Sequence, residues 1–277
     1  MPLPELWTVI LYDLNIKYQG IKYEECLNDT DFISRYIEYT DIHHMFSYTE
    51  FIRTRSRLAK DYFDQYVGTS GISQHRLVGL DCEMIETDRG QELGRVTIVG
   101  QDGRVVYDQF VIPNGNVVDY RTKWSGITET DLKDGIGFKL AQSKVLQIVG
   151  SNTILVGHSL EHDLKVLCIK HGRIIDTAYQ FLSTDGFKVA LKTLVQKHLG
   201  SRIQQGSHDS AEDALSSLRL LGLRVWQLQN MISKKKQIVL DGTVRMIKVG
   251  NRREIKGIEG YKVVLVEKNG MKYVAYE

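Results

Sequence analysis

Cysteine and proline are scarce in this chain of 277 residues, which contains three of each. The cysteines, Cys26, Cys82 and Cys168, are odd in number and widely spaced, which excludes a disulfide framework and a paired zinc-ligand motif. This usage is typical of a reducing compartment inside the cell. No run reaches the roughly 18 apolar residues of a membrane-spanning helix, and the start lacks a charged segment followed by an apolar stretch. We therefore expect neither secretion nor a membrane anchor.

A strong net charge is also missing, because 36 Lys and Arg residues oppose 34 Asp and Glu residues for a net charge of +2. This balance excludes a uniformly basic nucleic-acid-binding protein. Residues 231–277 nevertheless contain eleven Lys or Arg against five Asp or Glu, a net charge of +6, which leaves −4 for residues 1–230. Hydrophobic residues make up 42% of the chain. The chain is therefore long enough and apolar enough for one full domain with additions.

Acidic residues that stand far apart in the sequence carry the clearest chemical signal. The run RLVGLDCE at 76–83 predicts a buried strand, in which side chains alternate between faces. Asp81 and Glu83 then share one face, and Cys82 lies on the other. Two neighbouring buried carboxylates repel, and a divalent cation that prefers hard oxygen ligands, Mg²⁺ or Mn²⁺, relieves that repulsion. Taken alone, the pair can equally be solvated and without a role.

Another acid is expected at the start of a helix. The β-branched run near 153–157 predicts a strand, and Ser159 is a candidate N-cap for the helix that follows. Asp163 then lies in the first turn of this helix, just past the strand end where ligands gather in α/β sheets. Taken alone, Asp163 can equally be a surface residue that stabilises the helix dipole.

The last acid and a histidine stand close together in the sequence. An apolar stripe from Ser210 to Gln227 predicts a long amphipathic helix with Asp213 in its first turns. His208 precedes this helix in a polar loop. A lone loop histidine is more often a solvated bystander, but imidazole is also the usual general base near neutral pH.

Together these residues resemble the DEDDh exonuclease superfamily, whose three motifs stand as DCE at 81–83, HSLEHDL with Asp163, and HDSAED at 208–213. The tyrosine-bearing branch would have Tyr where this chain has Asp209, so the histidine branch is the match. Further stretches such as DYRTKWSGIT and FKVALKTLVQKHLG are similar to the eukaryotic RNA exonuclease family of the Rex1, Rex3 and Rex4 group. The resemblance covers about residues 74–225. One departure is His162, where that family usually has Asn.

The resemblance implies an α/β protein with an RNase H-like fold, in which helices cover both faces of a five-stranded mixed sheet. The residue patterns agree with this fold. They predict strands near 76–83, 93–100, 104–112, 153–157 and 173–177, and helices near 138–149, 160–171, 188–199 and 209–230.

The resemblance also implies a two-metal site for phosphodiester hydrolysis. Two divalent ions, Mg²⁺ or Mn²⁺, would be held by Asp81, Glu83, Asp163 and Asp213. His208 would be the general base. Met84 and Arg121 would lie near the terminal nucleotide. From the residues alone, Met84 can be core filler, and Arg121 can be a phosphate clamp or a surface ion pair.

The activity that follows is 3′→5′ trimming of single-stranded RNA ends with release of nucleoside 5′-monophosphates. Structured precursors such as rRNA or tRNA, in the nucleus or nucleolus, are the expected setting, with other RNA-processing factors as partners. The alternatives are a poly(A) deadenylase or a DNA-directed exonuclease of the same superfamily. A non-catalytic RNA-binding scaffold is a third interpretation.

Three parts are expected along the chain: a helical N-terminal segment at 1–73, an exonuclease domain at 74–230 and a small basic β-module at 231–277. Gly68–Gln74 is interpreted as a linker. In the β-module, Asp241-Gly242 and Asn269-Gly270 each predict a hairpin turn, which pairs QIVL with TVRMIK and YKVVLVEK with MKYVAYE. Lys234–Lys236 are expected to end the long helix. The module could hold the RNA backbone or pack against the nuclease core.

Overall fold

The computed structural model describes Cys26–Asn28, Thr30, Ile33 and residues 65–183, 187–240, 254–258, 261–268 and 271–276. The chain divides into two compact units, Lys17–Leu223 and a second unit made of Met1–Ile16 with Arg224–Glu277. Most of the N-terminal segment predicted to be helical lies outside the described residues. The three predicted domain boundaries stay predictions.

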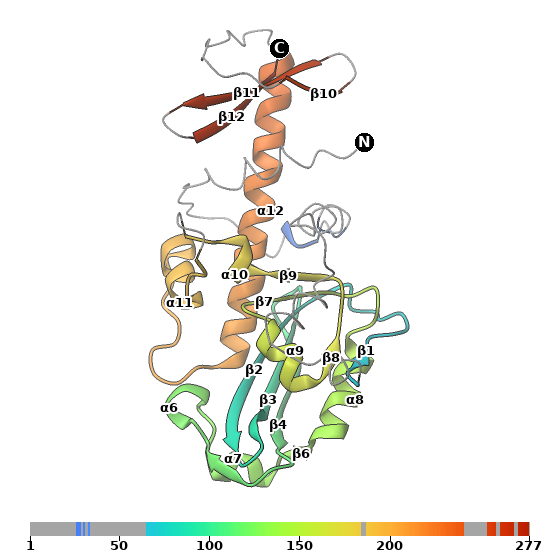
Figure 1. Ribbon diagram of the computed structural model, residues 1–277, viewed down its shortest axis with the longest axis vertical. Coiled ribbons are helices and arrows are strands. Elements are labelled where there is room, and N and C mark those ends of the chain that lie inside the picture. Colours follow the sequence, from blue (N-terminus) through green and yellow to red (C-terminus); the bar gives the residue numbers. More distant parts are fainter. Residues whose placement is uncertain are drawn as a thin grey trace. The chain divides into compact units, whose positions relative to one another are not determined.

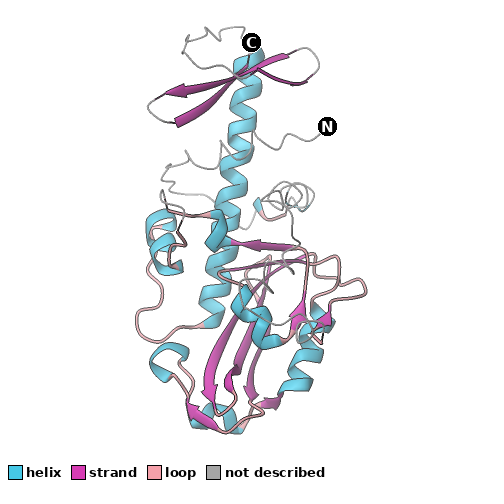
Figure 2. Cartoon of the chain, viewed as in Figure 1, coloured by secondary structure: helices cyan, strands magenta, loops and turns pink. Residues whose placement is uncertain are grey.

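A mixed sheet forms the centre of the first unit (Figure 1; Figure 2). Its strand order is β6-β4-β3-β2-β7-β9, and β5 also pairs with β2. β2, β3 and β4 run antiparallel to one another, whereas β7 is parallel to β2, β9 is parallel to β7 and β6 is parallel to β4. The strands are β2 Leu77–Thr87, β3 Gly90–Gly100, β4 Val105–Ile112, β5 Val117–Asp119, β6 Ile136–Gly137, β7 Ile154–Gly157 and β9 Ile174–Asp176. The five predicted strands are therefore confirmed, and the short β5 and β6 extend the sheet.

Helices cover both faces of this sheet. They are α6 Thr122–Ser125, α7 Glu129–Lys133, α8 Phe138–Ile148, α9 Glu161–Leu167, α10 Thr177–Gln180, α11 Leu191–Leu194 with a π-helical turn η1 at Val195–Leu199, and α12 Ser210–Leu240. α8 and α9 contribute Val145 and Leu164 to the main hydrophobic core. α12 lies against the other face at Gly79, where a Cβ would come within 2.8 Å of the Ala214 carbonyl oxygen. No helix in the described part of the chain is long and apolar enough to cross a membrane.

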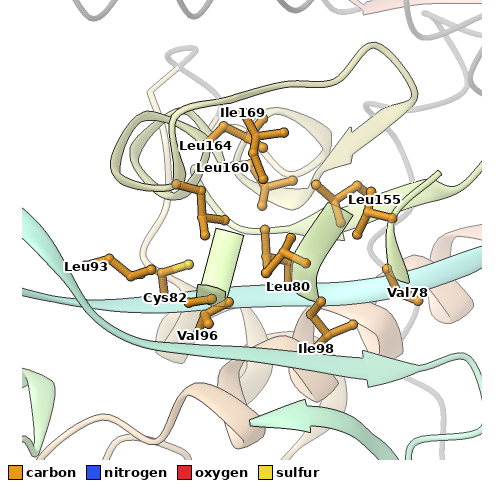
Figure 3. Close-up of a cluster of buried hydrophobic side chains, with 14 of the residues drawn as sticks. Val78, Leu80, Cys82, Leu93, Val96, Ile98, Leu155, Leu160, Leu164 and Ile169 are labelled. Atoms are coloured by element: carbon orange, nitrogen blue, oxygen red, sulfur yellow. The ribbon is translucent and has the colours of Figure 1, made fainter. Parts of the chain in front are cut away.

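The main core follows from the alternation of β2. Val78, Leu80 and Cys82 point to one face and pack with side chains of β3, β7 and α9, among them Leu155 and Leu160 (Figure 3). Since neighbouring residues of a strand point to opposite faces, Asp81 and Glu83 lie on the face away from this core. The predicted separation of Cys82 from the two acids is confirmed.

The start and end of α9 differ from the prediction. Ser159 is not the N-cap, because its φ of 63° is left-handed and Leu160 occupies the capping position. The carboxylate of Asp176, at the end of β9, instead accepts hydrogen bonds from the backbone N–H groups of Ser159 and Leu160. The helix ends at Leu167 rather than near residue 171, because Cys168 turns left-handed and the chain continues as β8, Ile169–Lys170.

The segment interpreted as a linker is bonded to the core. β1, Val67–Gly68, pairs in parallel with β8. Further along, the Gly71 carbonyl accepts a hydrogen bond from the Ser151 N–H, and the Ser73 hydroxyl donates to the Ile148 carbonyl. The segment that leads into the mixed sheet is therefore held at several points along its length.

The second unit contains a three-stranded antiparallel sheet of β10 Glu254–Ile258, β11 Tyr261–Lys268 and β12 Met271–Tyr276. The hairpin predicted around Asn269-Gly270 is confirmed, since Lys268 pairs with Met271. The prediction of a strand at QIVL, residues 237–240, is wrong, because these residues are the end of α12. The turn and the second strand predicted for the same hairpin lie outside the described residues. Lys234–Lys236 are accordingly inside the helix. Between Leu223 and Asp241 the sequence has no Gly or Pro to stop a helix.

Candidate active site

The structure brings the four predicted acids together from three elements. Asp81 and Glu83 come from β2, Asp163 from the first turn of α9, and Asp213 from the first turn of α12. Glu83, Asp163 and Asp213 are only 6%, 4% and 3% exposed, and Asp81 is half-buried. The charges of the other three acids all act on Asp81. Four carboxyl groups are therefore gathered, largely buried, at the central strand β2.

Burial is the main reason why the pKa values of these acids are raised. The pKa of Glu83 is raised to about 8 by burial and then by the charges of Asp213 and Asp163. The pKa of Asp81 lies well above its usual value, first through burial and then through repulsion from the other three acids. Burial also raises the pKa values of Asp163 and Asp213. Without a cation, the cluster therefore holds protons near neutral pH.

Asp163 and Asp213 are each held by one specific hydrogen bond. Asp163 Oδ1 accepts from the backbone N–H of Cys82 at 2.7 Å, and Asp213 Oδ2 accepts from Gln204 Nε2 at 2.7 Å. These bonds leave other oxygens unused. Asp213 Oδ1 and Glu83 Oε1 are buried and have no hydrogen-bond partner among the described residues.

The donor set fits a hard divalent cation. Four carboxylates supply the oxygen ligands that Mg²⁺ and Mn²⁺ prefer, and two buried carboxylate oxygens have no other partner. A cation would also lower the raised pKa values by replacing like-charge repulsion with attraction. In the described residues, no three His, Cys, Asp or Glu side chains are already arranged as a complete metal-binding group.

Arg95 is a functional candidate that the sequence reasoning missed. Its guanidinium makes a two-bond contact with Asp108, at 2.8 and 2.7 Å, and Nη1 lies 3.6 Å from Asp209 Oδ1. The positive charge of Arg95 opposes the rise in the pKa values of Asp81 and Glu83. It is the cation that faces the acid pair from the neighbouring strand.

A β-bulge explains why Arg95 was missed. Met84 pairs with Leu93 and Glu83 pairs with Arg95, which leaves Gly94 as an extra residue. Strict alternation would put Arg95 on the face of Leu93, in the core. With the bulge it lies opposite Glu83, on the acid face. The available signal was the glycine inside an otherwise regular strand pattern, which indicates a bulge or a close approach.

His208 lies beside Asp213, as the sequence motif requires. Its Nδ1 is 3.6 Å from Asp213 Oδ2, and its side chain is 38% exposed. The backbone N–H of His208 donates to the Trp124 carbonyl at 2.7 Å, which ties the loop to α6. Burial and then the charge of Lys192 lower the pKa of His208 below its usual value. The imidazole is thus neutral at pH 7 and able to accept a proton.

Met84 and Arg121, the two residues predicted to contact substrate, lie in different surroundings. Met84 follows Glu83 in β2, and its half-buried side chain packs against the main core. Arg121, with a left-handed φ of 53°, precedes α6 and lies 5.7 Å from the centre of the Trp124 ring. His162, the departure in the second motif, is exposed and lies 3.7 Å from Glu161. The roles of these residues stay predictions.

The chain is similar in sequence to known exonucleases. The exonuclease family model RNase_T matches residues 78–221. RNA exonuclease 1 of Saccharomyces cerevisiae is 42% identical over 153 residues, 54% of this chain and 28% of the relative. RNA exonuclease 3 of Yarrowia lipolytica is 40% identical over 60% of this chain and 23% of its own length. The chain thus spans less than a third of either relative.

Solved structures are also similar. The Neurospora crassa Pan2 catalytic unit superposes with a TM-score of 0.53 and 26% identity, covering 70% of this chain and 36% of that one. A Saccharomyces cerevisiae Pan2 module in complex with AAGGAA RNA gives a TM-score of 0.52 and 26% identity, covering 67% and 33%. The predicted RNase H-like α/β fold class is confirmed.

Proposed function

The chain belongs to the RNase_T exonuclease family, and from this premise we propose that it is a metal-dependent 3′→5′ exoribonuclease. It trims RNA 3′ ends and releases nucleoside 5′-monophosphates. The observation that carries the proposal is the convergence of Asp81, Glu83, Asp163 and Asp213 beside a neutral histidine. RNA as substrate is supported by relatives named RNA exonucleases and by a similar Pan2 module solved with RNA.

The four acids are the residues that would hold two divalent ions, Mg²⁺ or Mn²⁺. When bound, such ions supply Lewis-acid stabilisation of the scissile phosphate and lower the pKa of an attacking water. The chain itself supplies the fixed carboxylates. The Cys82 N–H orients Asp163 from the sheet, and Gln204 orients Asp213 from the loop.

His208 accepts the proton of the attacking water. With Nδ1 facing Asp213, the neutral imidazole carries its hydrogen on that nitrogen and leaves Nε2 free as the base. Asp213 then stabilises the imidazolium that forms. The bond from the His208 backbone N–H to the Trp124 carbonyl sets the position of the base relative to the substrate side of the site.

Substrate preference would be determined by residues beside the four acids and His208. Arg121 and Met84 contact the 3′-terminal nucleotide, and a contact to the 2′-hydroxyl would favour RNA over DNA. On the family resemblance, the natural substrates are structured precursors such as rRNA or tRNA in the nucleus or nucleolus. Other RNA-processing factors are the expected partners. The same chemistry would also serve a deadenylase or a DNA-directed exonuclease.

A cleavage assay tests the proposal. The protein is incubated with 5′-labelled single-stranded RNA and Mg²⁺ or Mn²⁺, and products are resolved over time beside Asp81→Asn and an EDTA control. A descending ladder that needs the metal and is lost in the variant supports 3′→5′ exoribonuclease action. Poly(A) and single-stranded DNA of equal length separate the two related activities. RNA that is bound but left intact would instead support a binding scaffold.

A further inference from the structure

Trp124 is a large aromatic side chain left in solvent beside the candidate active site. It lies in α6 and is 53% exposed. A single exposed apolar side chain is common and carries no meaning by itself. Here, however, the ring lies beside cations. Lys123 Nζ is 5.4 Å and Arg121 Cζ is 5.7 Å from the ring centre. An aromatic face next to cationic side chains is an arrangement that can bind a base and its phosphate together.

The ring lines a cleft of about 460 Å³. Its lining includes two lysines and no carboxylate, although the acid cluster is close by. The residues that matter here are Trp124, Lys123, Lys192, Gln204, Ser207 and His208. A cleft with this lining attracts a polyanion, and its polar side chains can bond to phosphate and sugar oxygens.

The cleft is joined directly to the catalytic machinery. His208 lines it while its ring lies 3.6 Å from Asp213, and Gln204 lines it while donating to the same carboxylate. Lys192 is near enough to His208 for its charge to act on the imidazole. A nucleic acid whose scissile phosphate lies at the acids would therefore pass through this cleft.

The helix α6, which carries Trp124 on one side of the cleft, is in contact with the loop that carries His208. The Trp124 carbonyl accepts the 2.7 Å bond from His208. Gly126 follows with a φ of 70°, and a Cβ there would lie 3.2 Å from the Ser207 hydroxyl and 3.3 Å from the His208 carbonyl. Since α6 and the His208 loop lie this close, the backbone of Trp124 is tied directly to the residue that carries the general base.

We propose that this cleft is a nucleotide subsite in which a base of single-stranded RNA stacks on Trp124 while Lys123 and Lys192 bind the adjoining backbone phosphates. The subsite rests on the proposed exoribonuclease function and adds to it a grip on the substrate that does not depend on base identity. Every base has a π-face, so stacking on indole is sequence-tolerant.

Binding of a short fluorescein-labelled single-stranded RNA to the full chain tests this subsite. All variants carry Asp81→Asn, so that RNA is not consumed, and Kd is measured by anisotropy with Mg²⁺ present. Trp124→Leu should raise Kd about tenfold or more, whereas Trp124→Phe, which keeps a ring, should raise it much less. Phe187→Leu, an aromatic that is 72% exposed and does not line this cleft, is the matched control and should bind as the parent does.

The salt dependence of RNA binding tests the proposed phosphate contact of Lys192. Lys192→Gln should weaken binding for all sequences and lower the slope of log Kd against log salt by about 0.7, the value for one phosphate contact on a single strand. Unchanged Kd in Trp124→Leu, or equal losses in the Leu and Phe variants, would overturn the stacking subsite. An unchanged salt slope in Lys192→Gln would overturn the phosphate contact.

The failure of this subsite and the failure of the proposed function can be told apart. The binding assays need no cleavage, and the ladder assay uses the parent chain. RNA trimming with Kd independent of Trp124 would reject the subsite alone. Kd that depends on Trp124, with no metal-dependent trimming of any single-stranded RNA, would reject the exonuclease and leave the subsite standing.

Discussion

The carboxylate of Asp163 accepts a hydrogen bond from the backbone N–H of Cys82, the residue between Asp81 and Glu83. This contact joins the first turn of α9 to β2 at the point where the first two acids leave the sheet. An N–H donor favours the charged carboxylate, and so it opposes the burial that raises the pKa of Asp163. The position of one candidate metal ligand is thus set by the strand that carries two others.

Asp163→Asn should separate the structural role of this residue from its chemical role. The amide oxygen of Asn can still accept from the Cys82 N–H, and the like-charge repulsion falls. We expect a Tm at or above that of the parent in EDTA, with RNA cleavage reduced by at least about 100-fold, because a candidate ligand is lost. Asp163→Ala should lose cleavage equally and also lower Tm, since it leaves the Cys82 N–H unpaired. Equal Tm values for both variants would argue against the anchoring role.

The stability of the metal-free protein should fall as pH rises. A carboxyl group whose folded pKa is above its unfolded value binds more protons in the folded state, so stability decreases between the two values. For Glu83 this window runs from about 4, the unfolded range, to about 8. Metal binding favours the charged carboxylates, so Mg²⁺ should raise Tm more at pH 8 than at pH 5.

Thermal unfolding in EDTA and in Mg²⁺ across this pH range measures the effect. Glu83→Gln removes the titrating group and should flatten the EDTA curve. A metal-free Tm that rises from pH 5 to pH 8 would contradict the raised pKa values of the cluster.

His208→Ala should reduce the cleavage rate by on the order of 10² to 10⁴, the usual contribution of a general base. The side chain is partly exposed and bonds to α6 through its backbone, so the fold and Tm should change little. His162→Ala, an exposed histidine near the acids, is the matched control and should cleave as the parent does. Single-turnover rates with saturating enzyme report the chemical step. A rise in KM with an unchanged single-turnover rate at saturation would reassign His208 to substrate binding.

Glu161, within the second motif, forms an ion pair with Lys188, and the two side chains are 9% and 33% exposed. Lys188→Met leaves a buried carboxylate without its cation and should cost about 1 to 3 kcal/mol, a range lowered because the lysine is partly solvated. Glu161→Gln in the same chain should recover most of this loss. Urea unfolding of the two single variants and the double variant gives the coupling energy. Additive losses would show that the pair contributes nothing as a pair.

Removal of residues 231–277 tests the basic C-terminal segment. If the segment holds the RNA backbone, Kd should rise and the salt dependence of log Kd should become shallower, since up to six net positive charges are lost. If it only stabilises the nuclease core, affinity should be unchanged while Tm falls. Circular dichroism confirms that the truncated chain is folded before either result is interpreted.

The parts of the fold that follow from local patterns could be predicted from the sequence. The alternation in RLVGLDCE placed Cys82 in the core and the acids opposite, and the apolar stripe predicted the start of α12 near Asp213. Neither depends on distant contacts. The gathering of the acids was expected from the family resemblance.

The predictions that were wrong or missing share a physical cause: contacts between residues far apart in the sequence, or the chain on either side, determine the local structure at these positions. Ser159 has the right side chain for an N-cap, but the carboxylate of Asp176, seventeen residues away in β9, accepts hydrogen bonds from the Ser159 and Leu160 N–H groups and Ser159 turns left-handed. QIVL at 237–240 has β-branched residues typical of a strand, yet it continues a helix that nothing interrupts. Arg95 was assigned no role because a bulge changed which face it occupies, and periodicity alone does not reveal a bulge.

The bulge at Gly94 also brings β3, which carries Arg95, into close contact with the segment that follows α6, which carries Trp124. A Cβ at this position would lie 2.6 Å from Ile127 Cδ1, and Ile127 follows α6 closely in the chain. The strand segment that carries Arg95 and the segment that follows the helix of Trp124 therefore lie in close contact at a residue without a side chain. One added methyl group at Gly94 would have to displace the Ile127 side chain, so the close packing of β3 against the segment after α6 depends on the absence of a side chain there.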